Sequence, residues 1–520
     1  MPSPTEAPAP AETPAEAPAA EREHRLHAWS WLFVLLQQIR QFIVPLAVLL
    51  FAGARAEDSV LLWPLVGVAA LVLASVWRYF TYRYRVDEDR LVIREGILER
   101  KVRQIPFARI HNVTLHQTLL HRAFGVAEVR LESAGGTRPE AEMRVLALDG
   151  AMALERLIRT RGSAPAAAHG AAAGAGSDDG IGTGTPLLTL PLGELVRLGL
   201  VSNRGMVVVA GAFALAWQAL PDRVLADLAL RHVRQAAGYA GSAIDGIGGR
   251  VLGLALVVLL AIAIVRLLSI ALAITQYHGF RLLLQGRRLT VERGLLTRLR
   301  TSVSRRRIQA WTLHEGLLHR LLRRRSLQVD TAAGAGAGES GDQRGLREIA
   351  PIATAGRCDA LVRGILPAAT WPPEHWHGLH RLAWVRLALP GAVVAAIAAG
   401  AACWHFGLPG MLALLWLPWA AFAARQHARR AGYALGGRLF AVRAGWWSRH
   451  WRFAEIDKIQ ALRLERGPLD RLFGTASLWL DTAGARPAAP ALRLRFLPAA
   501  EARALHERLV AELSRIPLRW

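Results

Sequence analysis

The chain has 520 residues, of which 52% are hydrophobic, and a formal net charge of +24 at neutral pH. This length excludes a single domain, and the presence of only two cysteines excludes a disulfide framework. Residues 1–25 are dominated by Pro, Ala and Glu. They predict a disordered tail rather than a signal peptide, which would need a basic start and an apolar run.

Strongly apolar stretches then follow in three pairs along the chain. A pair of spans of about 20 residues each crosses the hydrocarbon twice and returns the chain to the side it left. A short amphipathic segment precedes each pair and predicts a helix in the headgroup plane. We therefore expect an interfacial helix and a transmembrane hairpin in residues 26–78, again in residues 187–276, and again in residues 371–425.

An arginine follows each amphipathic segment, at Arg40, Arg204 and Arg386. We expect these side chains to extend from the first membrane turn toward the headgroups, as long basic side chains do at membrane interfaces. For Arg40 the alternative is a functional charge inside the membrane.

The segment behind each pair of spans is an internal repeat. Shifts of 198 and 349 positions superimpose the copies without a gap, so that equivalent residues are Gly96, Gly294 and Gly445, then Ile110, Ile308 and Ile459, then Leu120, Leu318 and Leu469. Alternation of apolar and polar residues predicts strands, and the repeated glycine predicts a turn with positive φ between two of them. We expect modules at residues 79–162, 277–367 and 430–520, with a flexible linker at residues 163–186.

Short motifs recur in each module. Copy three contains Ile459-Gln460, then Asp470-Arg471-Leu472-Phe473-Gly474, then Asp481-Thr482-Ala483-Gly484. With these motifs the chain resembles the bacterial pleckstrin-homology-like (bacterial PH domain) multi-pass membrane proteins, with the module repeated three times. Copy two departs from the pattern at Arg323, where the motif has Gly.

The resemblance implies a split β-barrel closed by a C-terminal helix and supplies no catalytic residues. The expected fold class is therefore membrane α + β: three transmembrane helical hairpins, each followed by a pleckstrin-homology-like split β-barrel with a C-terminal helix.

Arginine runs make module two the most cationic of the three. The cytoplasmic leaflet of a membrane is anionic, and each basic residue near it gains about 1 kcal/mol. We interpret the runs as candidate anionic-lipid contacts, with a solvated face that assists topology as the alternative; nucleic acid is not expected as a partner. The candidate residues are Arg305, Arg306, Arg307, Arg323, Arg324 and Arg325.

The same charge bias places the N-terminus, the modules and the C-terminus in the cytoplasm of a bacterial inner (plasma) membrane. The connector at residues 222–250 carries four arginines, so its side stays open. We find no phosphate-binding loop and no pattern for a catalytic, cofactor or metal site. The expected function is non-enzymatic binding or scaffolding at the membrane surface, in envelope integrity or stress, with lipids and with a protein partner or self-association. The alternative is a component of a transport or export system.

Overall fold

The computed structural model describes residues 82–96 except 88, 101–133, 141–161, 186–219, 247–331, 347–484 and 489–515, with residue 231 and scattered positions between 24 and 81. The chain divides into two compact units. The first spans residues 1–110, 121–130 and 140–174, and the second spans residues 111–120, 131–139 and 175–520. Modules two and three therefore lie within the second unit.

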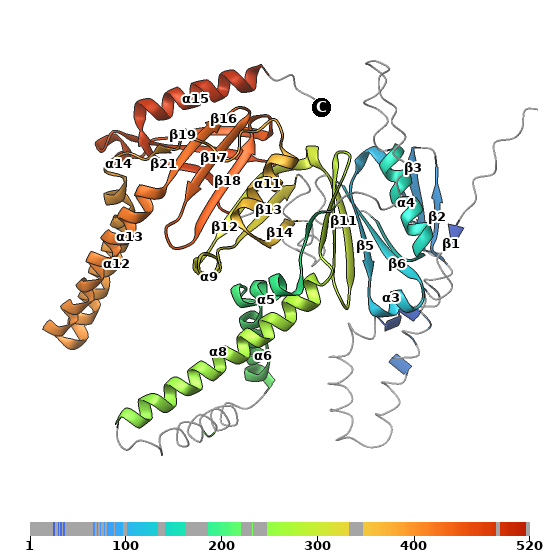
Figure 1. Cartoon of the computed structure of the whole chain (residues 1–520), viewed down its shortest axis with the longest axis horizontal. Helices are drawn as coiled ribbons and strands as arrows, with labels where there is room; N and C mark the ends of the chain where they lie inside the picture. Colours follow the sequence, from blue (N-terminus) through green and yellow to red (C-terminus); the bar gives the residue numbers. More distant parts are fainter. Residues whose placement is uncertain are drawn as a thin grey trace, which may run out of the picture. The chain divides into compact units, whose positions relative to one another are not determined.

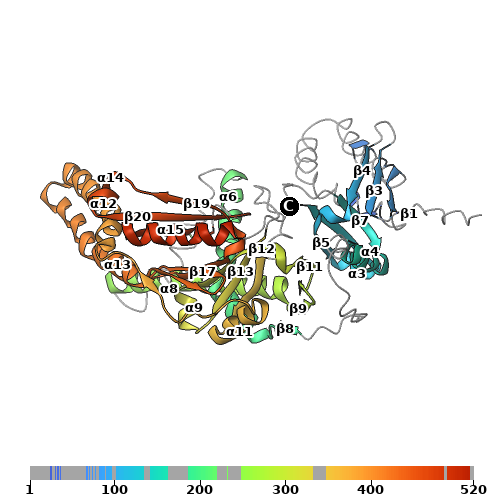
Figure 2. The same ribbon diagram turned by 90° about the horizontal axis from the view of Figure 1, so that it is seen from above.

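Module three shows the plan that the repeats share: four antiparallel strands, a 3-10 turn, three more strands with a short helix after the first, and a final helix. The final helix buries Leu505 and Leu509 against the three-stranded sheet (Figure 2). The elements are β15 (His377–Gly378), β16 (Gly432–Gly436), β17 (Leu439–Ala444), β18 (Arg449–Glu455), η6 (Ile456–Lys458), β19 (Ile459–Glu465), α14 (Pro468–Leu472), β20 (Thr475–Thr482), β21 (Leu492–Pro498) and α15 (Ala499–Ser514).

Modules two and one follow the same plan. Module two has β8 (Pro186–Thr189), β9 (Arg281–Gln285), β10 (Arg288–Arg293), β11 (Arg298–Ser304), η4 (Arg305–Arg307), β12 (Ile308–Glu315), α9 (Leu317–Leu321), β13 (Arg325–Thr331), β14 (Glu348–Ala353) and α11 (Ala355–Ile365). Module one has β1 (His24–Arg25), β2 (Arg83–Val86), β3 (Arg90–Glu95), β4 (Lys101–Pro106), η2 (Phe107–Arg109), β5 (Ile110–Gln117), α3 (Leu119–Ala123), β6 (Val126–Ser133), β7 (Ala141–Ala147) and α4 (Leu148–Arg161).

The apolar helices lie between the first and second strands of a module. They are α5 (Leu192–Val201), α6 (Arg204–Ala219), α8 (Ile247–Tyr277), α12 (Ala383–Phe406) and α13 (Trp416–Arg430), with a 3-10 segment η5 (Leu408–Leu415) before α13. Among the described residues, three helical segments are long and apolar enough to cross a membrane: residues 251–277, 383–406 and 408–430. The pair α5 and α6, bent by 53°, is a fourth candidate if it is one broken span. The first expected hairpin lies almost wholly outside the described residues.

The first strand of each module precedes its membrane helices in sequence. β8 pairs with β9, and β15 pairs with β16, so the apolar helices of modules two and three form an insertion after the first strand of a sheet. The sequence analysis placed these strands outside the modules, because β8 and β15 are only four and two residues long. In the third segment the expected interfacial helix is not formed: strand β15 lies there, and α12 begins at Ala383.

Neighbouring modules join through their sheets, and no module closes a barrel. In module two β11 and β12 belong to different sheets: β11 pairs with β5 of module one, and β12 pairs with β18 of module three (Figure 1). All residues of these two junctions lie in the second unit. The details of the expected split barrel are not confirmed: at the two junctions the strands that border the split pair with strands of the adjacent module, whereas β4 of module one and β19 of module three are edge strands among the described residues.

The repeated glycine lies in a strand-to-strand turn, as predicted. Its φ is +90° at Gly96, +112° at Gly294 and +85° at Gly445, a region that side chains with a Cβ rarely adopt. A Cβ at Gly445 would also overlap the carbonyl oxygen of Ser448 across the turn, and Gly294 has the equivalent contact with Thr297. Both the positive φ and the overlap with a carbonyl oxygen therefore disfavour any residue with a Cβ at this position of the turn.

The junction between modules two and three is packed as tightly as a domain core. Trp311 on β12 stacks on Phe453 of β18, with ring planes 2° apart, and Trp371 stacks on the same phenylalanine at 4.2 Å. Beside the rings, Arg452 of β18 reaches across β12 to Asp330 of β13 at 2.8 Å, and both side chains are 2% exposed. A buried ion pair of this kind fixes the register, because a slipped strand would leave each charge unpaired.

Candidate membrane-contact surface

One end of modules two and three is connected directly to the apolar helices. The turn after β10 is tied to the end of α8, since Gly294 N–H donates to His278 O and Leu295 N–H donates to Thr275 O, both at 2.9 Å. In module three, His380 N–H, just before α12, donates to Phe496 O at 2.9 Å. We call this the membrane end of each module.

The short helices α9 and α14 lie at the membrane ends of modules two and three and expose leucines. Leu321 of α9 is 78% exposed and Leu472 of α14 is 77% exposed, although each is followed by a well-packed strand. Arginines accompany these leucines in both helices. An exposed leucine beside an arginine suits the headgroup region, where the apolar part is buried in lipid and the guanidinium meets phosphate. The exposed apolar residues of α3, α9 and α14 are Leu119, Leu120, Leu317, Leu321, Leu469 and Leu472.

Two repeated arginines connect the membrane helices to the modules. Arg386, in the first turn of α12, binds Asp470 of α14 at 2.9 Å and lies 4.7 Å from the ring centroid of Phe496. Burial opposes ionisation of Asp470, but hydrogen bonds from Gly467 N–H, Thr475 and Arg386 outweigh this effect and lower its pKa.

Arg204, in the first turn of α6, binds Tyr277 Oη at 2.6 Å and Glu348 of β14 at 3.3 Å. Both arginines thus face protein carboxylates rather than reaching toward headgroups as expected. Arg40, the third member of this set, lies outside the described residues.

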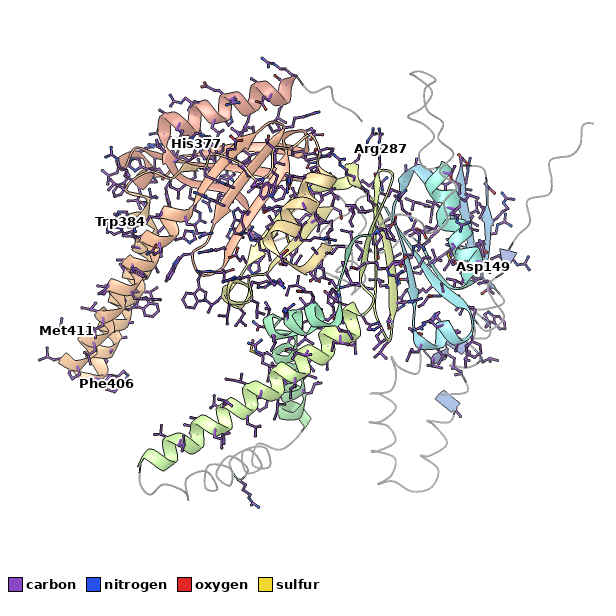
Figure 3. All side chains as sticks on the ribbon, in the orientation of Figure 1. Asp149, Arg287, His377, Trp384, Phe406 and Met411 are labelled. Atoms are coloured by element: carbon purple, nitrogen blue, oxygen red, sulfur yellow. The ribbon has the colours of Figure 1, made fainter. Side chains whose placement is uncertain are left out.

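The six candidate lipid arginines fall at opposite ends of module two. Arg305–Arg307 form η4, between β11 and β12, and Arg305 N–H donates to Arg287 O at 2.8 Å. Figure 3 shows Arg287 at the end of the module away from α8. Arg306 is exposed, whereas burial, aided by Arg288, lowers the pKa of Arg307 to about 10. This run therefore lies at the end opposite to the membrane helices.

The second run lies at the membrane end, but most of its charge is paired. Arg324 makes two hydrogen bonds to Glu194 of α5, at 2.8 and 2.9 Å. Arg325 binds Glu315 at 2.8 Å and lies over the ring of Trp451. Arg323 is exposed and has φ of +53°. The sequence could not separate these roles, because the carboxylate partners come from other elements.

A pocket that the sequence analysis missed lies beside α6 and α8 at the membrane end of module two. Its volume is about 580 Å³. Its polar side contains Arg204, Arg293 and Tyr277, and the two guanidinium groups share one carboxylate, Glu348. Its apolar side includes Val207, Val208, Leu272, Leu296 and Leu299, and the remaining lining residues are Thr275, Gln276, Thr297 and His116 of β5. A cationic group beside an apolar wall matches a lipid with an anionic headgroup.

A family model described as "Bacterial PH domain" matches residues 33–162, 226–357 and 379–513, which covers most of the chain. The chain belongs to the bacterial PH domain family. The second and third matches each include apolar helices as well as strands of a module.

One curated relative is a UPF0699 transmembrane protein, YdbT, of Bacillus subtilis (strain 168), which is 22% identical over 290 residues. The match covers 55% of this chain and 55% of that protein, so the chain spans about half the length of this relative. No solved structure matches the chain. The transmembrane relative, the apolar helices and the threefold family match identify this bacterial PH domain protein as a membrane protein with three repeats.

Within the described part of the chain, no group of three His, Cys, Asp or Glu side chains is placed to hold a metal ion. Cys358 is buried in the core of module two, and burial raises its pKa to about 12, which keeps the thiol protonated and unreactive.

Proposed function

We propose that this bacterial PH domain protein is non-enzymatic and presents its three modules at the cytoplasmic face of the inner membrane, for binding or scaffolding in envelope integrity or stress. The observation that carries the proposal is the membrane end of modules two and three. There, exposed leucines and arginines of the short helices lie beside the first turns of the apolar helices, to which Arg324–Glu194 and Arg386–Asp470 connect them. Modules held in this way contact the bilayer surface directly.

We further propose that each pair of apolar helices is a transmembrane hairpin. In the third pair, α12 and α13 lie side by side, and Phe406 and Met411 occupy the end away from the module (Figure 3). The segment between the two helices, residues 407–415, has no formal charge, whereas the modules carry many arginines. The bias of basic residues toward the cytoplasm supports modules inside and this segment outside.

The pocket beside α6 and α8 is the proposed lipid site, in preference to the arginine runs. Two guanidinium groups facing one carboxylate leave net positive charge, and Arg–phosphate contacts are strong and directional. The apolar wall continues onto the outer face of α6, where an acyl chain would lie in the bilayer. The shared chemistry is that of an anionic phospholipid headgroup.

A transport component is the second candidate, and one observation weighs against it. Arg266 is an ionisable residue inside the long span α8, and transporters use paired ionisable groups there. Its guanidinium instead donates to the carbonyl oxygens of Leu200 and Ser202, both at 3.1 Å, where α5 ends. Positive charge at a helix C-terminus stabilises the helix, so this arginine has a structural role.

The test of surface contact uses the full-length protein in lipid nanodiscs. A polarity-sensitive fluorophore is attached to Leu321→Cys in a background with Cys358→Ala and Cys403→Ala, and nitroxide groups on the lipid headgroups act as quenchers. We expect strong quenching at position 321 and little at Arg306→Cys, the matched control at the opposite end of the same module. Equal quenching at both positions, or none at 321, would refute membrane contact by α9.

A further inference from the structure

The two junctions between modules have the same register. Val113 of β5 pairs with Ser302 of β11, and Trp311 of β12 pairs with Phe453 of β18. A shift of 198 positions, as from Ile110 to Ile308, converts Val113 into Trp311, and a shift of 151, as from Ile308 to Ile459, converts Ser302 into Phe453. Each module therefore offers the fifth strand of its plan to the fourth strand of the module that follows.

This pairing of fifth with fourth strands does not involve the fourth strand of module one or the fifth strand of module three. In module one, β4 is the fourth strand and is the last in its sheet; in module three, β19 is the fifth strand and is the first in its sheet. Both are edge strands among the described residues. Edge strands expose backbone groups that can pair with another chain unless they are covered.

Exposure supports the same conclusion. Ala461 and Arg463 of β19 are exposed, whereas the equivalent Ala310 and Thr312 of β12 are buried beneath the next module. On β4, residues 101–104 are all exposed, and Val102 is 52% exposed. The equivalent residues of β11 and β18 are mostly buried. The exposed surfaces of β4 and β19 are therefore equivalent to surfaces that a neighbouring module covers at the internal junctions.

The buried ion pair of the junction also has its counterparts at the two ends. Arg452 on β18 pairs with Asp330 on β13. A shift of 151 positions takes Asp330 to Asp481 of β20, which is exposed, and a shift of 349 takes Arg452 back to Arg103 of β4, which is also exposed. The local geometry agrees, since Asp481 is opposite Ala461 as Asp330 is opposite Ala310. Opposite charges therefore stand at equivalent places on the two edges.

We propose that β19 of one copy pairs antiparallel with β4 of a second copy and continues the array head to tail. The register of the internal junctions places Leu462 opposite Gln104 and Leu464 opposite Val102. It also brings Asp481 to Arg103 across β19. An interface between two different surfaces of the same chain builds rings or open filaments rather than a closed dimer.

The test is disulfide trapping between two differently tagged full-length chains in native membranes. One chain carries Gln104→Cys and the other Leu462→Cys, each with Cys358→Ala and Cys403→Ala. Because each chain has one cysteine, a species with both tags is intermolecular. Directly opposite residues have Cβ atoms about 4.5–5.5 Å apart, within reach of a disulfide or a short bis-thiol reagent.

We expect a covalent dimer with both tags, at least fivefold above the register control, in which Arg466→Cys replaces Leu462→Cys. Arg466 is four residues further along, roughly 13 Å at 3.3 Å per residue. Failure to form this dimer, equal yield in the control, or a predominant dimer of Leu462→Cys chains alone would overturn the proposal.

Charge reversal at the two edges gives a second test of the same register, read out as the yield of the same disulfide. Arg103→Asp in the Gln104→Cys chain should lower the yield at least fivefold, and Asp481→Arg in the other chain should restore it. Thermal melting of each variant checks that it remains folded. Yields that do not respond to the first change, or are not restored by the second, would show that β4 and β19 do not meet in the inferred register.

Discussion

Replacement of Gly445 is the sharpest test of how the repeated turn is built. The residue lies between β17 and β18 with φ of +85°, and an added Cβ would overlap Ser448 O. Gly474 offers a matched control: its φ is +64°, but no heavy atom lies within 4 Å of its ideal Cβ. Alanine at Gly474 therefore meets backbone strain only, whereas alanine at Gly445 meets the strain and the overlap.

The structure gives magnitudes for the two changes. Left-handed backbone costs a residue with a Cβ about 1–2 kcal/mol, which is the expected loss for Gly474→Ala. At Gly445 the turn must also open, which disturbs the pairs Ala444–His450 and Arg443–Trp451 next to it. We expect a total of about 3–5 kcal/mol for Gly445→Ala, among the larger effects of single substitutions. The β-branched side chain of Gly445→Val adds crowding, so its loss should be larger still.

Hydrogen exchange in the full-length protein measures the effect locally. Amides of residues 439–455 should exchange about 30–100-fold faster in Gly445→Ala than in Gly474→Ala, since each 1.4 kcal/mol is a factor of ten. The full chain is needed, because β18 pairs with β12 of module two. Equal exchange in the two variants would show that the turn accommodates a Cβ and that our steric reasoning is wrong.

Three further predictions concern single side chains. Arg323 has the positive φ that glycine has at both equivalent positions, so Arg323→Gly should stabilise the protein by about 1 kcal/mol in thermal melting, and Arg323→Ala should not. Arg386→Gln and Asp470→Asn should each destabilise module three, and a double-mutant cycle should give a coupling of about 1–3 kcal/mol; additive losses would mean that the ion pair carries no energy of its own. His450 and His319 are neutral at pH 7 because burial lowers each pKa from 6.5 to about 4. The junction between modules two and three should therefore lose stability as pH falls from about 6.5 to about 4, because these histidines bind protons at a higher pH in the unfolded state than in the folded state. His450→Gln should flatten the dependence of amide hydrogen exchange at this junction on pH.

The repeat, the apolar segments and the family could all be predicted from the amino-acid sequence alone. Gap-free recurrence of Gly96, Gly294 and Gly445 required one local structure in three places, and the observed φ values agree. Such features depend on neighbouring residues: a turn needs a residue without a Cβ, and a span needs a run of apolar side chains. The one departure from the motif was also informative, since Arg323 keeps the backbone conformation of the glycines it replaces.

Which arginines remain free to bind a ligand, and which strands pair across a module junction, depends on the tertiary structure. The runs around Arg306 and Arg324 are indistinguishable as sequence, yet one lies away from the membrane helices and the other pairs with Glu194, which is 130 residues away in the chain. The short strand β8 and the junction of β12 with β18 likewise depend on partners brought together by folding. The pattern of side chains predicts that a strand forms. Its partner strand depends on packing between segments that are distant in the sequence, and the local sequence carries no information about that packing.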